Sequence, residues 1–330
     1  MLTALQGRRG FDGDLPAPLP PGSEAVVPPA DVQEQRIDEA ATAAPWSDME
    51  AFVAQLKKNE PTPPLLPAWA HSPCNVSTEK TYSFDTCEAP VAPGAGSAAY
   101  VRGPRDYHPV DENDIRQGSL GDCYLLSSLA AMARNQDGRE ILHRAITETT
   151  RDGARAWVVT LRVPLAQPLD PARPWKEVRI EVPDRFLPSS ARTDSREGRA
   201  ELWPKILEAA IIRYEAGADL VGHGGFASRV LPLLTGMPAT ERPVGELWSA
   251  FARGDVPVVG LGEYVKKKGD PPYGLVEKHA YSVDSVFADD RGRRMVQLRN
   301  PWGSNHPAPI PLDEMASIGL FMTTSPRPRS

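Results

Sequence analysis

The run CYLLSSLAAMARN, residues 123–135, constrains the fold of this chain more than any other stretch. Its large apolar residues recur at the three- and four-residue spacing of one helix face, and alanines and further leucines lie beside them. A face this wide predicts a helix at the centre of a core. Asp122 precedes the run and is a residue type that caps helix N-termini. The pattern therefore places Cys123 at the first position of a buried helix.

The rest of the second half of the chain predicts further helices and then strands. LWPKILEAAIIRYEAG predicts a helix with proline in its first turn and glycine at its end. Helices are expected at 202–217 and 245–255, and strands at 155–165, 176–188, 256–264, 279–288 and 293–303. This order predicts an α+β fold with a cleft between a helical lobe, residues 95–240, and a β-rich lobe, residues 241–330.

Residues 1–94 form a proline-rich, acidic N-terminal segment. Few large apolar residues occur in 1–45, so we expect this part to be poorly folded, whereas 46–58 predicts one short amphipathic helix. The segment is interpreted as a linker or tail, a partner-docking or secretion region, or a piece that occludes the cleft. Cys74 and Cys87 are able to pair in an oxidising compartment, or remain reduced thiols in a cytoplasm.

Composition excludes several classes of protein. A net charge of −6 over 330 residues gives no electrostatic reason to expect a nucleic acid or an anionic membrane as partner. No run approaches the roughly 18 apolar residues that a membrane helix needs. The first residues lack the basic-then-apolar order of a secretory signal. We therefore expect a cytoplasmic protein, or one exported without a classical signal peptide.

Cys123 has two interpretations, a packed core thiol or a nucleophile. A nucleophilic cysteine reacts as its thiolate, which the positive end of a helix dipole stabilises. It also needs a base, usually histidine, and a third group that orients the imidazole. His279 opens a predicted strand, and the partner strand ends at LRNPWG. Folding this hairpin about residues 289–291 brings Asn300 within reach of His279.

The intermediates of acyl transfer require hydrogen-bond donors for an oxyanion. Gln117, six residues before Cys123, offers a side-chain N–H, and the backbone N–H of Cys123 offers another. Gly118 and Gly121 allow the backbone to approach a substrate carbonyl closely. Each residue alone has an ordinary structural interpretation. Together, in the order cysteine, histidine, asparagine, they favour nucleophilic catalysis.

QGSLGDCYLLSSLA, KHAYSVDSV and LRNPWG are similar to the three active-site segments of the calpain family of papain-like cysteine proteases. ELWPKILEAAIIRYEAGADLVGHGG resembles the segment between them, and the likeness spans about residues 105–322. The resemblance implies Cys123 as nucleophile, His279 as general base and acid, Asn300 as orienting residue and Gln117 as oxyanion donor. Trp302 matches the tryptophan that family members pack over the histidine–asparagine contact.

The sequence also departs from the family pattern. Lys278 stands where glycine usually precedes the histidine, and this cation either lowers the pKa of the histidine or points outward. Asp114 and Asp219 match positions of a family calcium site, so calcium is a possible ligand, although two surface aspartates without metal fit equally. In the second family calcium site, His306 replaces an acidic residue.

We therefore predict a papain-like cysteine endopeptidase that acts on protein substrates through a thioester and requires no cofactor for its chemistry. Two alternatives remain: a transglutaminase-like acyltransferase on the same fold, and a non-catalytic binding protein. The bias toward alanine, proline and arginine is typical of a GC-rich bacterial genome, which fits a standalone protease or a delivered effector.

Overall fold

The central helix, α2, spans Cys123–Arg134, one residue shorter than predicted. Its residues from Cys123 to Ala133 are all buried, which agrees with the wide apolar face in the sequence. The two serines within it satisfy their hydroxyls internally: Ser128 donates to the carbonyl of Tyr124 at 2.7 Å, and Ser127 donates to the carbonyl of Ala280 at 3.0 Å. The second bond ties α2 to a strand that lies more than 150 residues further along the chain.

These features come from a computed structural model, which describes residues 91–94, 96–102, 108–164, 175–193, 195–196, 199–215, 221–264 and 269–328. All of them belong to one compact unit. The predicted helix at 46–58, the Cys74–Cys87 alternatives and the character of the N-terminal segment lie outside these residues. No helix in the described ranges is long and apolar enough to cross a membrane.

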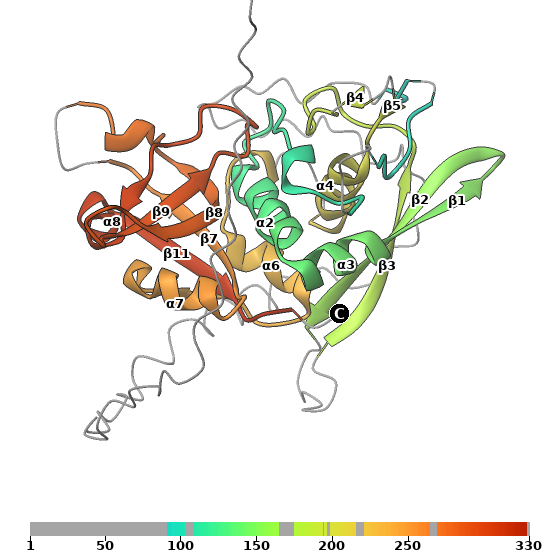
Figure 1. The fold of residues 1–330 in the computed structure, drawn as a ribbon. Helices are drawn as coiled ribbons and strands as arrows, with labels where there is room; N and C mark the ends of the chain where they lie inside the picture. The colour runs from blue at the N-terminus through green and yellow to red at the C-terminus, as the bar shows by residue number, and fades with distance from the viewer. Residues whose placement is uncertain are drawn as a thin grey trace, which may run out of the picture. The chain divides into compact units, whose positions relative to one another are not determined.

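A first hydrophobic core surrounds α2. The predicted helix with Pro204 in its first turn is α4, Trp203–Tyr214. Two helices of this core were not predicted, although the buried residues of each recur at helical spacing. They are α3, Gln136–Ala145, and α6, Ala227–Thr235. Figure 1 shows helices α3, α4 and α6 around α2.

A three-stranded antiparallel sheet, in the order β1-β2-β3, packs against this core. Both predicted strands of this region are present and pair with each other, whereas the first strand was not predicted. The bounds are β1, Ile146–Arg151, β2, Ala154–Pro164, and β3, Trp175–Pro183. Two short strands, β4, Ser195–Arg196, and β5, Arg199–Ala200, form a separate ribbon.

The C-terminal part is a six-stranded antiparallel sheet in the order β10-β9-β8-β7-β11-β6. Its strands are β6, Thr240–Arg242, β7, Val256–Leu261, β8, His279–Ala288, β9, Arg294–Arg299, β10, Ile310–Pro311, and β11, Leu320–Ser325. The sheet has its own hydrophobic core, to which α7, Leu247–Ala252, and α8, Leu312–Ile318, contribute. The β8–β9 hairpin turns at residues 289–293, as the sequence predicts.

The two cores meet along α2, which packs on β8 and β7 (Figure 1). The mixture of helices and antiparallel sheets confirms the predicted α+β class. The boundaries at residues 95 and 241 remain predictions, and the first core also takes in Val256, Val258 and Ala280 from beyond residue 241.

Candidate active site

Cys123 is the first residue of α2, where the unpaired backbone N–H groups of the helix concentrate positive potential. Its side chain is 9% exposed and lies within hydrogen-bonding reach of the backbone of Ala280. Burial raises the pKa of the thiol to about 11, and the nearby carboxyl of Asp122 adds to this rise. In this arrangement the resting side chain is therefore a thiol at neutral pH.

His279 begins β8, next to Ala280, and its Nε2 lies 3.0 Å from Oδ1 of Asn300. The predicted hairpin of β8 and β9 brings these two residues together, as expected from the sequence. Oδ1 of Asn300 also accepts the backbone N–H of Trp302 at 3.0 Å, and Nδ2 donates to the carbonyl of Asn305 at 3.2 Å. These two bonds fix the orientation of the Asn300 amide. Nε2 of His279, which faces Oδ1, must therefore carry the proton. The imidazole is thereby held with Nδ1 unprotonated.

The rings of Trp302 and Tyr281 enclose the imidazole of His279. The centroid of each lies 4.9 Å from the imidazole centroid, with Trp302 tilted at 49° and Tyr281 edge-on at 85°. Asn300 is fully buried. Burial lowers the pKa of His279, and the hydrogen bond to Asn300 offsets part of this effect. The imidazole is therefore neutral at neutral pH and available as a base.

Lys278 has an exposed side chain and a backbone φ of +52°. This left-handed conformation favours glycine, the residue that the resembling family places here. Because burial accounts for the lowered pKa of His279, the outward-pointing alternative holds for Lys278.

Gln117 lies on a loop that several backbone contacts hold in place. Its backbone N–H donates to the carbonyl of Pro301 at 2.8 Å, and its carbonyl accepts Nε of Arg192 at 3.0 Å. Its side-chain Nε2 donates one hydrogen to the carbonyl of Leu120 at 2.7 Å. An amide nitrogen carries two hydrogens, and the Gln117 side chain is also a hydrogen-bond partner of the Asp122 carboxyl.

Gly118 and Gly121 are required by close packing of the backbone. A Cβ at Gly118 would lie 2.1 Å from the carbonyl oxygens of Ser189 and Ser190, and one at Gly121 would lie 2.3 Å from that of Gly222. At both positions the missing side chain lets the loop pack closely on a neighbouring segment. The close approach of these glycines to a substrate carbonyl remains a prediction.

Asp122 occupies the N-cap position of α2, but its side chain makes no capping hydrogen bond. The prediction that it caps the helix is therefore wrong for the side chain. The carboxyl instead faces Glu208 of α4, and both side chains are fully buried. Sequence reasoning missed Glu208, because a single glutamate in a helix is usually a surface residue.

Asp114 is buried and makes contacts of its own. One carboxylate oxygen, Oδ2, accepts the backbone N–H of Asp111 at 2.8 Å and Nε1–H of Trp203 at 2.9 Å. Asp219 lies outside the described residues. Within the described ranges no group of three or more histidine, cysteine or acidic side chains is placed to hold a metal. The calcium site remains a prediction, and Asp114 has a structural role without it.

His306 supports Asn300, a role that the sequence did not predict. Its Nδ1 accepts the backbone N–H of Asn300 at 3.1 Å, close to the amide that faces His279. No sequence pattern predicts this contact, since the two residues lie six apart on a turn. The imidazole at this position therefore fixes the end of β9.

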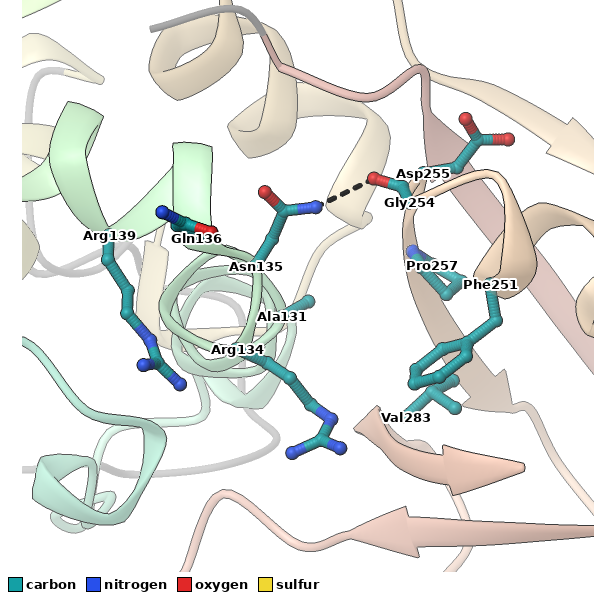
Figure 2. Close-up of a pocket in the computed structure, with 10 residues that line it drawn as sticks. All are labelled: Ala131, Arg134, Asn135, Gln136, Arg139, Phe251, Gly254, Asp255, Pro257 and Val283. Carbon is teal, nitrogen blue, oxygen red and sulfur yellow. Dashed lines mark hydrogen bonds between the residues drawn. The ribbon is translucent and has the colours of Figure 1, made fainter. Parts of the chain in front are cut away.

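A separate pocket lies at the opposite end of α2 from Cys123 (Figure 2). Figure 2 shows the side chains of Arg134 and Arg139 on one side and the ring of Phe251 on the other, with Asn135 donating to the carbonyl of Gly254 at 2.7 Å. Helix α2, which separates Cys123 from this pocket, is about 17 Å long at 1.5 Å per residue. The pocket is therefore distinct from the candidate active site.

Residues 103–307 match the family described as calpain family cysteine protease. The calpain-type cysteine protease DEK1 of Zea mays is 28% identical over 211 residues, which are 59% of this chain and 9% of that protein. Calpain-9 of Homo sapiens is 29% identical over 213 residues, 58% of this chain and 28% of that protein. The match covers more than half of the chain, so the chain belongs to the calpain family of cysteine proteases. It spans less than a third of these relatives.

Proposed function

We propose that this chain is a cysteine endopeptidase that hydrolyses protein substrates through a thioester on Cys123. The observation that carries the proposal is the contact between Nε2 of His279 and Oδ1 of Asn300 at 3.0 Å, next to the Ala280 backbone that the thiol reaches. Membership of the calpain family supports the same reaction class. The finer assignment of roles to these residues is our proposal.

In the first step the sulfur of Cys123 attacks the carbonyl carbon of the scissile peptide. The thiol proton passes to Nδ1 of His279, the nitrogen that its hydrogen bond to Asn300 leaves free. A side-chain N–H of Gln117 and the backbone N–H of Cys123 stabilise the negative oxygen of the tetrahedral intermediate. His279 then donates its proton to the leaving amine, and the thioester forms.

In the second step a water molecule attacks the thioester carbonyl. His279 takes a proton from the water and returns a proton to the sulfur, which restores the free enzyme. Trp302 and Tyr281 limit access of solvent to the hydrogen bond between His279 and Asn300, so the imidazole keeps its orientation through both steps. Asn300 carries no charge and does not change protonation.

We also propose a papain-like arrangement for these groups. Cys123 and Gln117 come from the part of the chain that forms the first core, and His279 and Asn300 come from the six-stranded sheet. Substrate would lie in a cleft between the two parts. The polar contacts between them, including Ser127 to Ala280, support a fixed relative position.

The decisive test is Cys123→Ala. We expect it to abolish casein hydrolysis while leaving the melting temperature near that of the wild type, because the side chain is small and alanine suits a helix. Cys74→Ser is the matched control and should keep full activity. Casein cleavage by purified Cys123→Ala at the wild-type rate would refute the proposal.

Acyl transfer to an amine is the second candidate, and the family match does not favour it. The two reactions share the thioester and differ only in the acceptor. Measuring incorporation of a labelled amine against peptide hydrolysis separates them, and we expect hydrolysis to dominate. A thiol-directed peptide warhead that fails to label Cys123 would instead favour the non-catalytic binding protein.

The N-terminal segment, residues 1–94, is proposed as an intramolecular inhibitor of the cleft. Its acidic, proline-rich sequence supports a segment that docks without a core of its own. A chain that begins near residue 95 should hydrolyse casein faster than the full chain. Equal rates would exclude inhibition and leave the linker and docking alternatives.

A further inference from the structure

Two carboxyl groups lie in contact directly before the nucleophile, and the mechanism above uses neither. Asp122 precedes Cys123, and Glu208 comes from α4. Both side chains are 0% exposed, and each is a hydrogen-bond partner of the other. Two ionised carboxylates repel each other at such a contact and offer no hydrogen to share. The buried contact therefore holds a proton.

The surroundings decide which carboxyl carries that proton. Glu208 accepts the backbone N–H of Ala191 with both oxygens, at 2.9 and 3.0 Å, and Ser190 and Lys205 also favour its charged form. Asp122 has fewer donors: its own backbone N–H and the Gln117 amide lie near it and lower its pKa, but neither gives an Asp122 oxygen a hydrogen bond of ordinary geometry. Hydrogen-bond donors stabilise a carboxylate. The negative charge therefore belongs on Glu208 and the proton on Asp122.

The position of this proton affects how readily the thiol of Cys123 ionises. An ionised Asp122 would put a negative charge beside the sulfur and oppose the positive end of α2. The nearby carboxyl is one of the causes that raise the pKa of the thiol. Because Asp122 makes no capping hydrogen bond, helix capping does not explain its presence.

Other titratable groups also lie close to the carboxyl pair. On α2, Cys123 and Tyr124 face Asp122, and the pKa of Tyr124 is raised mainly by burial. On α4, Lys205 faces Glu208, and burial lowers the pKa of this lysine. The nearby Gln117 amide is neutral. None of these groups supplies a positive charge next to Asp122.

We propose that Asp122 and Glu208, the carboxyl pair, share one proton that stays on Asp122, so that the charge of the pair lies on Glu208 and away from the reacting sulfur. Asp122 and Glu208 are thus positioning residues. They affect the thiolate of Cys123 through where the negative charge of the pair lies. The inference rests on the proposed role of Cys123 as the nucleophile.

The test compares two neutral variants of equal size in a full chain that carries Cys74→Ser and Cys87→Ser. The rate of alkylation of Cys123 by iodoacetamide is measured against pH, because it reports the thiolate fraction. In Glu208→Gln the new amide donates to Asp122 and lets it ionise beside the sulfur. A unit negative charge beside the sulfur predicts alkylation at least ~10-fold slower at neutral pH.

Asp122→Asn places no charge beside the sulfur and should alkylate at least as fast as the parent chain. The double variant Asp122→Asn/Glu208→Gln should recover the rate that Glu208→Gln loses. A purely structural role would make the two single variants alike, since each replaces one carboxyl with one amide. Equal rates for the two, or a slower Asp122→Asn, would overturn the proposal.

A second measurement covers the case in which Glu208→Gln does not fold. The infrared spectrum of the parent chain at neutral pH, minus that of Asp122→Asn, should contain the carbonyl stretch of a buried protonated carboxyl. A difference spectrum without that band would overturn the proposal. Neither measurement depends on peptide hydrolysis. An intact alkylation pattern in a chain that does not cleave casein would therefore refute only the proposed function.

Discussion

The backbone N–H of Gln117 donates to the carbonyl of Pro301 at 2.8 Å, and this bond joins the loop before Cys123 to the turn after Asn300. The proposed oxyanion donor and the proposed orienting residue are therefore held together by backbone rather than by flexible side chains. Arg192 holds the same loop from the other side through the carbonyl of Gln117 at 3.0 Å. Such fixed donors need little reorganisation when charge develops on a substrate oxygen.

Gln117→Ala should lower kcat for casein hydrolysis by about 10²–10³-fold, the cost of losing one oxyanion donor. The rate of Cys123 alkylation should stay near the wild-type value, because alkylation forms no oxyanion. Steady-state kinetics and iodoacetamide labelling check the two expectations. A parallel fall in both rates would mean that the loop itself had collapsed.

As pH falls, activity should be lost with a midpoint below the ordinary histidine pKa of about 6.5. Burial lowers the pKa of His279, so its folded pKa lies under the unfolded value. Activity needs the neutral imidazole; it is complete above the unfolded pKa and is lost as pH falls through the folded one. The profile of kcat/KM against pH measures this midpoint.

His143 is the matched control for this profile. Burial lowers its pKa too, but its ring packs on Tyr100 and His108, away from Cys123. His143→Gln should leave the midpoint of the acid limb unchanged. A wild-type midpoint at or above the ordinary value would contradict the assignment of His279 as the base.

Arg299→Met should destabilise the chain by about 1–3 kcal/mol, because two carbonyls lose a buried donor. Nε of Arg299 lies 3.1 Å from the carbonyl of Glu112, and Nη2 lies 3.5 Å from that of Ile115. The control is Arg291→Met in the hairpin turn, where the side chain is exposed and the backbone N–H donates to Oδ1 of Asp289 at 2.9 Å. Urea unfolding of both variants measures the difference. Equal stability of the two variants would show that this contact between distant segments of the chain is dispensable.

Asp114→Ala should lower the stability by about 1–2 kcal/mol even in the presence of a chelator. The backbone N–H of Asp111 and Nε1–H of Trp203 lose their acceptor, and this loss does not involve metal. Thermal melting in a chelating buffer measures it. A melting temperature equal to that of the wild type would contradict the structural role.

The predicted calcium site gives a separate expectation. Calcium should raise the melting temperature of the wild type, and Asp219→Asn should remove that rise while leaving the value in chelator unchanged. A ligand that binds only the folded state stabilises it by RT ln(1 + c/Kd), where c is the free ligand concentration, so the rise grows with the calcium concentration. Identical melting with and without calcium would exclude a site at Asp114 and Asp219.

Local pattern was sufficient for the elements that carry the candidate site. The apolar spacing of 123–135 predicted α2 to within one residue, and the hairpin at 279–299 was predicted by alternation and turn residues. Both signals arise from contacts between residues close in sequence, so the chain displays them directly. Helices α3 and α6 were missed even though their buried residues recur at helical spacing, because α3 has few large apolar side chains and Pro232 lies within α6.

The sequence by itself determined that Cys123 begins a buried helix and that His279 and Asn300 face each other across a hairpin. Only the tertiary structure decided that the thiol meets the backbone of Ala280 and that Asp122 turns from the helix end to Glu208. These contacts join segments more than 80 residues apart. They depend on how α2, α4 and β8 pack, and packing is a property of the whole core that no local spacing encodes.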